Sequence, residues 1–390
     1  MRRGLFELAK VFLKLGTTAF GGPAAHIAMM RDEIVRRRRW LSEQQFLDLI
    51  SATNLIPGPN STEMAIHVGH ARAGWRGLLV AGVCFILPAT LIVWGLAHTY
   101  VRWGTLPEME AVFYGVKPVI IAIIARALVG LGRTAVKSVW LGLLGAGSML
   151  AVALGLHEIA VLSAAGLLTL GGGWLTRRRA SGNTPLLALP AAVAAGTPTP
   201  VRAALLAGAG GSIGGATAIG LGKLFLVFLK AGALLFGSGY VLLAFLRADL
   251  VERLGWLTEK QLLDAIAVGQ ITPGPVFTTA TFVGFVLGGS AGALVATVGI
   301  FLPAFVYVAA SAPIVPRLRR SRLAAAALDG LNVASLALMI AVTWHLARAS
   351  LQDPVAIGLA VLSLLVLATT RVNSVWLVLA GGIVGFATNL

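Results

Sequence analysis

The sequence predicts an all-α polytopic membrane protein of two homologous halves, arranged as an inverted-topology repeat with broken or re-entrant helices. The first observation behind this prediction is composition. Of 390 residues, 57% are hydrophobic and 12% are charged, which is too apolar for a soluble domain of this length. Residues 77–97, 290–310 and 355–370 carry no charge, and they approach or reach the roughly 20 residues that a helix needs to span a bilayer.

The second observation is an internal repeat. A shift of 216 positions aligns FG at 20–21, WL at 40–41 and PGP at 57–59 with FG at 236–237, WL at 256–257 and PGP at 273–275. One residue is then lost, and a shift of 215 aligns LPA at 87–89 with LPA at 302–304. The repeat predicts a first domain at 1–175 and a second at 223–390. Residues 176–222 form a linker, in which 203–222 could add one further crossing.

The third observation is the charge of the loops, because Lys and Arg mark the cytoplasmic side of a membrane protein. Segment 31–43 has five basic residues, whereas its counterpart 247–260 has three basic and three acidic ones. Segment 101–111 has one basic and two acidic residues, but 314–323 has four arginines. Corresponding loops therefore prefer opposite sides, as in inverted-repeat transporters. Because the net charge of +16 comes largely from such loops, no nucleic-acid partner is expected.

The first apolar segment of each half is broken by small residues. Gly21, Gly22 and Pro23 interrupt the first half, and Gly237 and Ser238 stand at the same place in the second. A broken helix presents a new N-terminus, whose free amides and partial positive charge bind anions. A lysine precedes each break, Lys14 or Lys230. Each is a candidate inward-facing cation, with a side chain that snorkels to the interface as the alternative.

The next segment of each half is broken by the PGP motif. Arg36 to Arg39 precede the first motif, and Arg72 and Arg76 follow it, so both flanks of the motif are predicted to be cytoplasmic. The simplest account is that residues 44–66 enter the membrane and return, turning near Pro57; a full crossing is the alternative. Proline removes an amide donor and breaks the helix, and such irregular backbone is tolerated at membrane depth only inside protein or beside a wet cavity.

Polar side chains cluster around both motifs and can donate hydrogen bonds to a ligand. Lys117 is a further candidate cation, and its repeat partner is Asn332. The candidate substrate-binding residues are thus Lys14, Gly21, Gly22, Pro23, Asn54, Pro57, Gly58, Pro59, Asn60, Lys117, Lys230, Gly237, Ser238, Gln270, Thr272, Pro273, Gly274 and Pro275. Cations, amides, hydroxyls and helix N-termini around one midplane cavity predict a site for a small polyvalent oxyanion.

Two other classes of function remain as alternatives. Glu63, His67 and His70 share one helical face, which an intramembrane metal-dependent hydrolase could use, although the spacing is not that of HExxH. Glu63 or His67 could instead carry a coupling proton. A channel would need no alternating access. No metal or other cofactor is expected, and the absence of a GxxxxGK[ST] motif argues against ATP-driven pumping by this chain alone.

These motifs resemble the chromate ion transporter (CHR) family in its long two-domain form. The resemblance rests on FGGP at 20–23, WLSE at 40–43, NLIPGPN at 54–60, GVKP at 115–118 and their second-half copies. The second half departs from the pattern at Ser238, Gly239 and Gln270.

The resemblance implies a multi-pass transporter, not an enzyme, in the cytoplasmic (inner) membrane. It would export chromate, and so confer chromate resistance, driven by the proton-motive force or by anion exchange. Sulfate or another oxyanion is the alternative substrate. The expected partners are the oxyanion, a proton or counter-anion and the lipid bilayer, with a homodimer left open. The family's motif residues correspond here to Gly21, Gly22, Pro23, Asn54, Pro57, Gly58, Pro59, Lys117, Phe236, Gly237, Pro273, Gly274 and Pro275.

Overall fold

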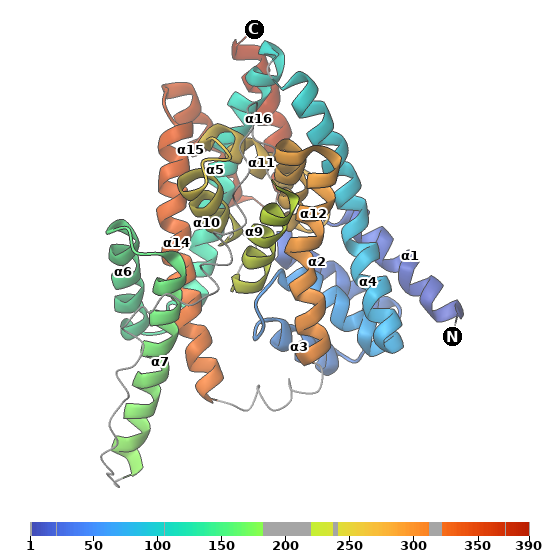
Figure 1. Ribbon diagram of the computed structural model, residues 1–390, viewed down its shortest axis with the longest axis vertical. Helices are drawn as coiled ribbons and strands as arrows, with labels where there is room; N and C mark the ends of the chain where they lie inside the picture. The colour runs from blue at the N-terminus through green and yellow to red at the C-terminus, as the bar shows by residue number, and fades with distance from the viewer. Residues whose placement is uncertain are drawn as a thin grey trace.

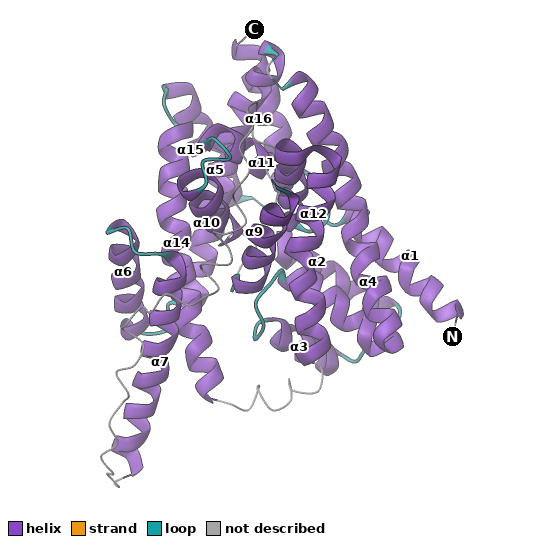
Figure 2. Ribbon diagram, in the orientation of Figure 1, coloured by secondary structure: helices purple, strands orange, loops and turns teal. Residues whose placement is uncertain are grey.

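The computed structural model describes residues 2–20, 22–104, 106–181, 220–236, 241–311, 322–370 and 372–389. Within these ranges the chain is helical, with no strand (Figure 2), so the all-α prediction is confirmed. Four described helices are long and apolar enough to cross a membrane, at Asn60–Trp103, Pro107–Ala135, Val276–Ser311 and Ala325–Ser350. The predicted site residues Gly21, Gly237 and Ser238 lie outside the described residues, as does most of the 176–222 linker.

The two halves match element by element (Figure 1). The first half contains α1 (Arg2–Thr18), α2 (Gly22–Arg31), the π-helical η1 (Asp32–Arg37), α3 (Glu43–Thr53), α4 (Asn60–Trp103), α5 (Pro107–Ala135), α6 (Val139–Ala153) and α7 (Glu158–Ser181). The second contains α9 (Leu221–Leu234), α10 (Leu242–Leu246), η3 (Arg247–Arg253), α11 (Glu259–Ile271), the 3₁₀ turn η4 (Val276–Thr278), α12 (Thr279–Ser311), α14 (Arg322–Ser350), α15 (Pro354–Thr369) and α16 (Ser374–Asn389).

Equivalent helices begin for the same local reason. Ser42 caps α3 by accepting a hydrogen bond from the Gln45 amide, while the Gln45 side chain accepts one from the Ser42 amide. Thr258 and Gln261 form the same reciprocal pair at the start of α11. This capping box satisfies amides that a helix start would otherwise leave without partners. The repeat is therefore preserved in the signals that start the helices as well as in the hydrophobic pattern.

Both α4 and α12 fold back on themselves as helical hairpins. In α4, Gly74 has φ +60°, and a Cβ added to Gly69 would lie 2.3 Å from the Gly77 carbonyl oxygen. Eight residues of straight helix would separate these two by about 12 Å, so the chain must reverse between them. In α12, Gly289 also has φ +60°. These reversals were not predicted from the sequence.

The hairpin in α4 explains how the first PGP motif enters and returns. Residues 43–53 run into the protein, the chain turns through the motif, and the first segment of α4 runs back out. The Arg72 guanidinium carbon lies 5.1 Å from the centre of the Trp40 ring, so the two flanks meet at one end of the molecule. This path agrees with a re-entrant segment, and its place in the membrane stays a prediction.

The halves run in opposite directions, as expected for an inverted repeat. The start of α5 contacts the end of α14, where Tyr114 donates to Asp353 at 2.5 Å. The end of α5 contacts the start of α14, where Lys137 Nζ lies 2.6 Å from Asp329 Oδ1. These repeat-equivalent helices are therefore antiparallel.

Two helices of each half also pack against one helix of the other half (Figure 1). Helix α5 packs on α15 and α16, while its equivalent α14 packs on α6 and α7. The approach is close because glycines line it. A Cβ added to Gly115 would lie 1.9 Å from the Gly381 carbonyl oxygen, and one added to Gly330 would lie 2.5 Å from the Ala165 carbonyl oxygen. Neither half therefore packs as a separate unit.

Candidate functional site

The PGP loops join the two halves through a reciprocal pair of hydrogen bonds. The Gly58 amide donates to the Leu235 carbonyl oxygen at 2.7 Å, and the Gly274 amide donates to the Ala19 carbonyl oxygen at 2.9 Å. Ala19 and Leu235 each end the first helix of a half. Each motif thus docks on the end of the first helix of the other half, and we call these two docking contacts together the junction.

Glycine is required at the centre of each motif by backbone geometry and by space. Gly58 has φ +141° and Gly274 has φ +88°, values that side-chain-bearing residues rarely adopt. A Cβ on Gly58 would lie 2.2 Å from Glu63 Oε1, and a Cβ on Gly274 would lie 2.7 Å from the Ala89 Cβ. Because both amides already have protein partners, we assign these glycines first to joining the halves.

A helix N-terminus lies next to each of the two docking contacts, that of α4 after Gly58 and that of α2 after Ala19. Pro59 is the N-cap residue of α4 and offers no side-chain acceptor, which leaves the first-turn amides without a side-chain cap. Helix α2 begins at Gly22 with Pro23 in its first turn, and an imidazole nitrogen of His26 lies 3.1 Å from the Ala19 carbonyl oxygen. Uncapped helix N-termini carry partial positive charge, so this junction suits an anion.

A polar cavity of about 510 Å³ opens beside the first motif; we call it the Asn54 cavity. It is lined by Asn54, Leu55, Ile56, Asn60, Leu131, Thr134, Ala135, Lys137, Ala325, Leu328, Asp329 and Asn332. Asn60 Nδ2 donates to Asn54 Oδ1 at 2.9 Å. That bond orients both side chains, and the remaining amide N–H groups of the pair are donors that a ligand could use.

A second polar cavity, of about 430 Å³, is the Lys117 cavity. It is lined by Pro107, Glu110, Ala111, Tyr114, Lys117, Lys260, Ala349, Ser350, Gln352 and Asp353. It uses the start of α5 and the end of α14, whereas the Asn54 cavity uses the end of α5 and the start of α14. Lys117 and Leu131 are 14 residues apart on α5, or about 21 Å along the helix. The two cavities therefore lie toward opposite ends of the molecule.

Lys117 is bound to a buried carboxylate. Its Nζ lies 2.9 Å from Asp264 Oδ1, and the side chains of Lys117 and Asp264 are 13% and 1% exposed. The Tyr100 hydroxyl donates to Asp264 Oδ2 at 2.8 Å. At the mouth of the same cavity Lys260 pairs with Glu110. The sequence prediction included Lys117 but missed Asp264 and Tyr100, although a carboxylate in the apolar run 262–269 was a usable signal.

Asp353 closes the edge of the Lys117 cavity. It lies between α14 and α15, where its carboxylate caps α15 by accepting from the Val355 and Ala356 amides, both at 2.9 Å. The Tyr114 hydrogen bond, followed by the Ala356 amide, holds the pKa of Asp353 below its usual value. The Asp353 carboxylate therefore caps α15 and already accepts hydrogen bonds from protein groups.

Glu63 lies next to the first motif, fully buried, and His67 follows one turn later, 4% exposed. Among the described residues, the two carboxylate oxygens of Glu63 have no hydrogen-bond partner, and His67 Nε2 has none either. In that same part of the chain no three His, Cys, Asp or Glu side chains gather closely enough to hold a metal ion. Glu63 and His67 are thus placed beside the junction, as a proton-binding role requires, and that role stays a prediction.

Lys14 and Lys230, which precede the breaks after the first helix of each half, lie outside both polar cavities. Lys14 Nζ lies 3.5 Å from Glu33 Oε2 with its side chain 56% exposed, and Lys230 Nζ lies 2.5 Å from Asp249 Oδ2. Neither lysine lines the Asn54 or the Lys117 cavity. Burial disfavours the charge on Glu33, but hydrogen bonds and charges from Arg38 and Lys14 outweigh it and lower the pKa of this carboxyl. A substrate role for either lysine stays a prediction.

The second motif is more enclosed than the first. Thr272 donates back to the Val268 carbonyl oxygen at 3.0 Å and so ends α11, while Gln270 Nε2 is buried without a described partner. Pro273 and Pro275 flank Gly274, and none of these residues lines the Asn54 cavity. The structure brings Asn54 and Asn60 to a cavity, but it does not bring their second-half equivalents to the same one.

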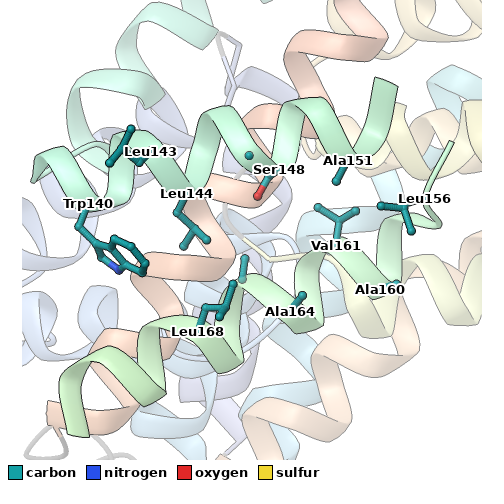
Figure 3. Close-up of a pocket in the computed structure, with 12 residues that line it drawn as sticks. Trp140, Leu143, Leu144, Ser148, Ala151, Leu156, Ala160, Val161, Ala164 and Leu168 are labelled. Atoms are coloured by element: carbon teal, nitrogen blue, oxygen red, sulfur yellow. The ribbon is translucent and has the colours of Figure 1, made fainter. Parts of the chain in front are cut away.

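A third cavity differs in chemistry from the two polar ones. Figure 3 shows the pocket of about 410 Å³ between α6 and α7, where Ser148 is the one hydroxyl among apolar side chains such as Leu144 and Leu168. No charged residue lines it. An oxyanion would lose its hydration there without compensation, so this pocket does not fit an anion.

Comparisons with known proteins agree with the repeat. The family model described as "Chromate transporter" matches twice, at residues 6–170 and 222–386. A probable chromate transport protein of Synechococcus elongatus is 32% identical over 358 residues, covering 90% of this chain and 86% of that protein. The chromate transport protein of Cupriavidus metallidurans is 32% identical, covering 98% and 92%, and that of Pseudomonas aeruginosa is 33% identical, covering 97% and 91%. No solved structure gives a significant match.

Proposed function

The chain belongs to the chromate transporter family, and from that premise we propose that it is a secondary transporter carrying chromate out of the cell across the cytoplasmic membrane. The proposed site is the junction of the PGP motifs. The proposed route runs through the Asn54 cavity on one side and the Lys117 cavity on the other. Alternating access to one site from two such cavities is the usual mechanism of inverted-repeat transporters.

The observation that carries this proposal is the pair of repeat-related polar cavities at opposite ends of α5 and α14. The junction is held by the reciprocal bonds of Gly58 and Gly274, and we propose that it separates the two cavities. A rocking of one half against the other would keep the two glycine bonds as a pivot while one cavity closes and the other opens.

The donors near the Asn54 cavity fit a tetrahedral oxyanion. Asn54 and Asn60 supply amide N–H groups, and the uncapped start of α4 supplies backbone amides and partial positive charge. Lys117 supplies a full charge at the other end. We propose Asn54, Asn60 and Lys117 as substrate-contacting residues, with Gly22, Pro23, Pro57, Pro59, Gln270, Thr272, Pro273 and Pro275 shaping the junction around them.

The membrane potential supports an outward direction. Moving one charge through 100 mV is worth about 2.3 kcal/mol, so a doubly charged anion leaving a negative interior gains about 4.6 kcal/mol. We assign the arginine-rich end, where Arg72 meets Trp40, to the cytoplasm. The Asn54 cavity is lined by the start of α14, which follows the four arginines of segment 314–323, so we propose this cavity as the entrance. A proton, with Glu63 and His67 as candidate carriers, or a counter-anion would adjust this driving force.

Sulfate is the second candidate substrate, because it has the same shape and charge as chromate and amide donors do not separate the two. Purified protein in proteoliposomes tests both anions. We expect labelled chromate to accumulate in the compartment made positive with potassium and valinomycin, and excess sulfate to compete if it shares the site. Absence of protein-dependent movement of either anion, at any imposed potential, would contradict the proposed function.

A further inference from the structure

We propose that Asp264 is the proton-binding group that decides whether Lys117 is available to the oxyanion. Proton binding at Asp264 and oxyanion binding at Lys117 then favour each other. This inference rests on the proposed function and adds to it a residue that couples the two ions.

The geometry makes Asp264 and the oxyanion competitors for one cation. Lys117 lines the cavity, while Asp264 lies behind it, 1% exposed, with Oδ1 at 2.9 Å from Lys117 Nζ. Oδ2 accepts the Tyr100 hydroxyl at 2.8 Å. A buried carboxylate is costly once its cation leaves. When Lys117 turns toward an oxyanion, Asp264 therefore takes up a proton from solvent on a carboxylate oxygen, and no other bond changes.

The charges around the Lys117 cavity are already matched in this state. Lys117 pairs with Asp264 and Lys260 pairs with Glu110, while Asp353 caps α15 and accepts the Tyr114 hydroxyl. Both lysines that line this cavity are thus already paired with carboxylates when an oxyanion enters. One proton on Asp264 removes a negative charge and leaves Lys117 as an uncompensated cation.

Other groups around Asp264 do not replace Lys117 as its partner. The elements packed against α11 are α4, α5, α12, α14, α16, η3 and η4. Tyr100 comes from α4, and Lys117 and Glu110 come from α5. Elements α12, α16 and η4 contain no Asp, Glu, Lys, Arg or His, and the one tyrosine of α12, Tyr307, donates to the Ala233 carbonyl oxygen.

The charged side chains that the structure describes on α14, η3 and α11 itself lie as follows. Asp329 pairs with Lys137, Arg348 lies over the Trp344 ring, His345 lines another cavity, Asp249 pairs with Lys230 and Arg253, Arg247 pairs with Glu252 and Glu259, and Lys260 pairs with Glu110. Protonation of Asp264 therefore leaves Lys117 as the cation that has lost its negative partner.

The repeat supplies an internal comparison. Asp48 of α3 is the equivalent of Asp264, and Asn332 of α14 is the equivalent of Lys117. The repeat equivalent of Lys117 is thus an amide, and Asp48 accepts a hydrogen bond from Gln44 Nε2 at 3.2 Å. Because Asn332 cannot serve as the cation that Lys117 is, Asp48→Asn, which removes the carboxylate at the repeat-equivalent position, is the matched control.

The test measures protons taken up as the purified full chain binds chromate or sulfate, by titration calorimetry in buffers of different ionisation heat. We expect the wild type and Asp48→Asn to take up close to one proton per anion at the alkaline end of the range. Their affinity should fall about tenfold per pH unit there, as linkage of one proton requires. Asp264→Asn should bind without proton uptake and with an affinity independent of pH.

Two results would overturn the inference while leaving the proposed function intact: anion binding by the wild type without proton uptake, or proton uptake by Asp264→Asn equal to that of the wild type. If Asp264→Asn does not fold, Lys117→Gln/Asp264→Asn removes both buried charges together and should bind weakly without proton uptake. Proton uptake by that double variant would also overturn it. A wild type that binds neither anion would overturn the proposed function and the coupling with it.

Discussion

Gly58 and Gly274 each hold the two halves together with one backbone hydrogen bond, from a conformation that other residues rarely adopt. We expect Gly58→Ala to destabilise the protein by about 1–3 kcal/mol, because the strained backbone adds to the collision with Glu63. The thermal unfolding midpoint in detergent measures this. Gly95→Ala is the matched control, since a Cβ there meets nothing within 4 Å, and an equal midpoint for both variants would contradict our assignment of Gly58.

Lys14 is the residue at which sequence and structure suggest different roles. The sequence predicts a substrate-binding cation, but the structure shows a half-exposed ion pair with Glu33, and exposed pairs contribute about 0–1 kcal/mol. We expect Lys14→Ala to keep its chromate KM within about twofold of the wild type in proteoliposomes. A KM raised tenfold or more at unchanged protein level would restore the sequence-based role.

Helices α3 and α4 form the re-entrant element, whose path can be tested by labelling. In a Cys84→Ser background, Arg36→Cys and Arg76→Cys should react with a membrane-impermeant maleimide from the same side. Glu108→Cys, which follows the crossing segment of α4, should react from the opposite side. Reaction of Arg36→Cys and Arg76→Cys from opposite sides would show that residues 44–66 cross the membrane.

The element scale also shows why part of the fold could be predicted. The repeat and the loop arginines can be recognised in the sequence, so the paired elements and the return of the first PGP segment could be predicted. The helical hairpins of α4 and α12 were not, because Gly288–Gly289 sits in an apolar run that resembles continuous helix, and Ala73–Gly74 is flanked by Arg72 and Arg76 without a proline that would end a helix. Those reversals depend on the close approach of Gly69 to Gly77 and of Gly284 to Gly292. No local sequence pattern predicts these contacts.

At the scale of the whole molecule, the inverted repeat produces two polar cavities, one lined by Asn54 and Asn60 and the other by Lys117 and Lys260. The sequence located the PGP motifs, Asn54, Asn60 and Lys117, because each stands out in an apolar chain. It missed Asp264 and Tyr100, since their meeting with Lys117 depends on the packing of α11 and α4 against α5. Contacts between the halves, rather than residue types, complete the candidate site.

The most direct test of the central claim is chromate counterflow in proteoliposomes for Asn54→Ala, beside Gln270→Ala at the repeat-equivalent position. Loss of a hydrogen bond to a charged ligand costs about 1.5–3 kcal/mol, so kcat/KM for Asn54→Ala should fall about 10- to 100-fold. Because Gln270 shapes the junction but does not line the Asn54 cavity, kcat/KM for Gln270→Ala should fall less than that for Asn54→Ala. Wild-type counterflow in correctly folded Asn54→Ala would place the oxyanion away from the first PGP motif and contradict the account.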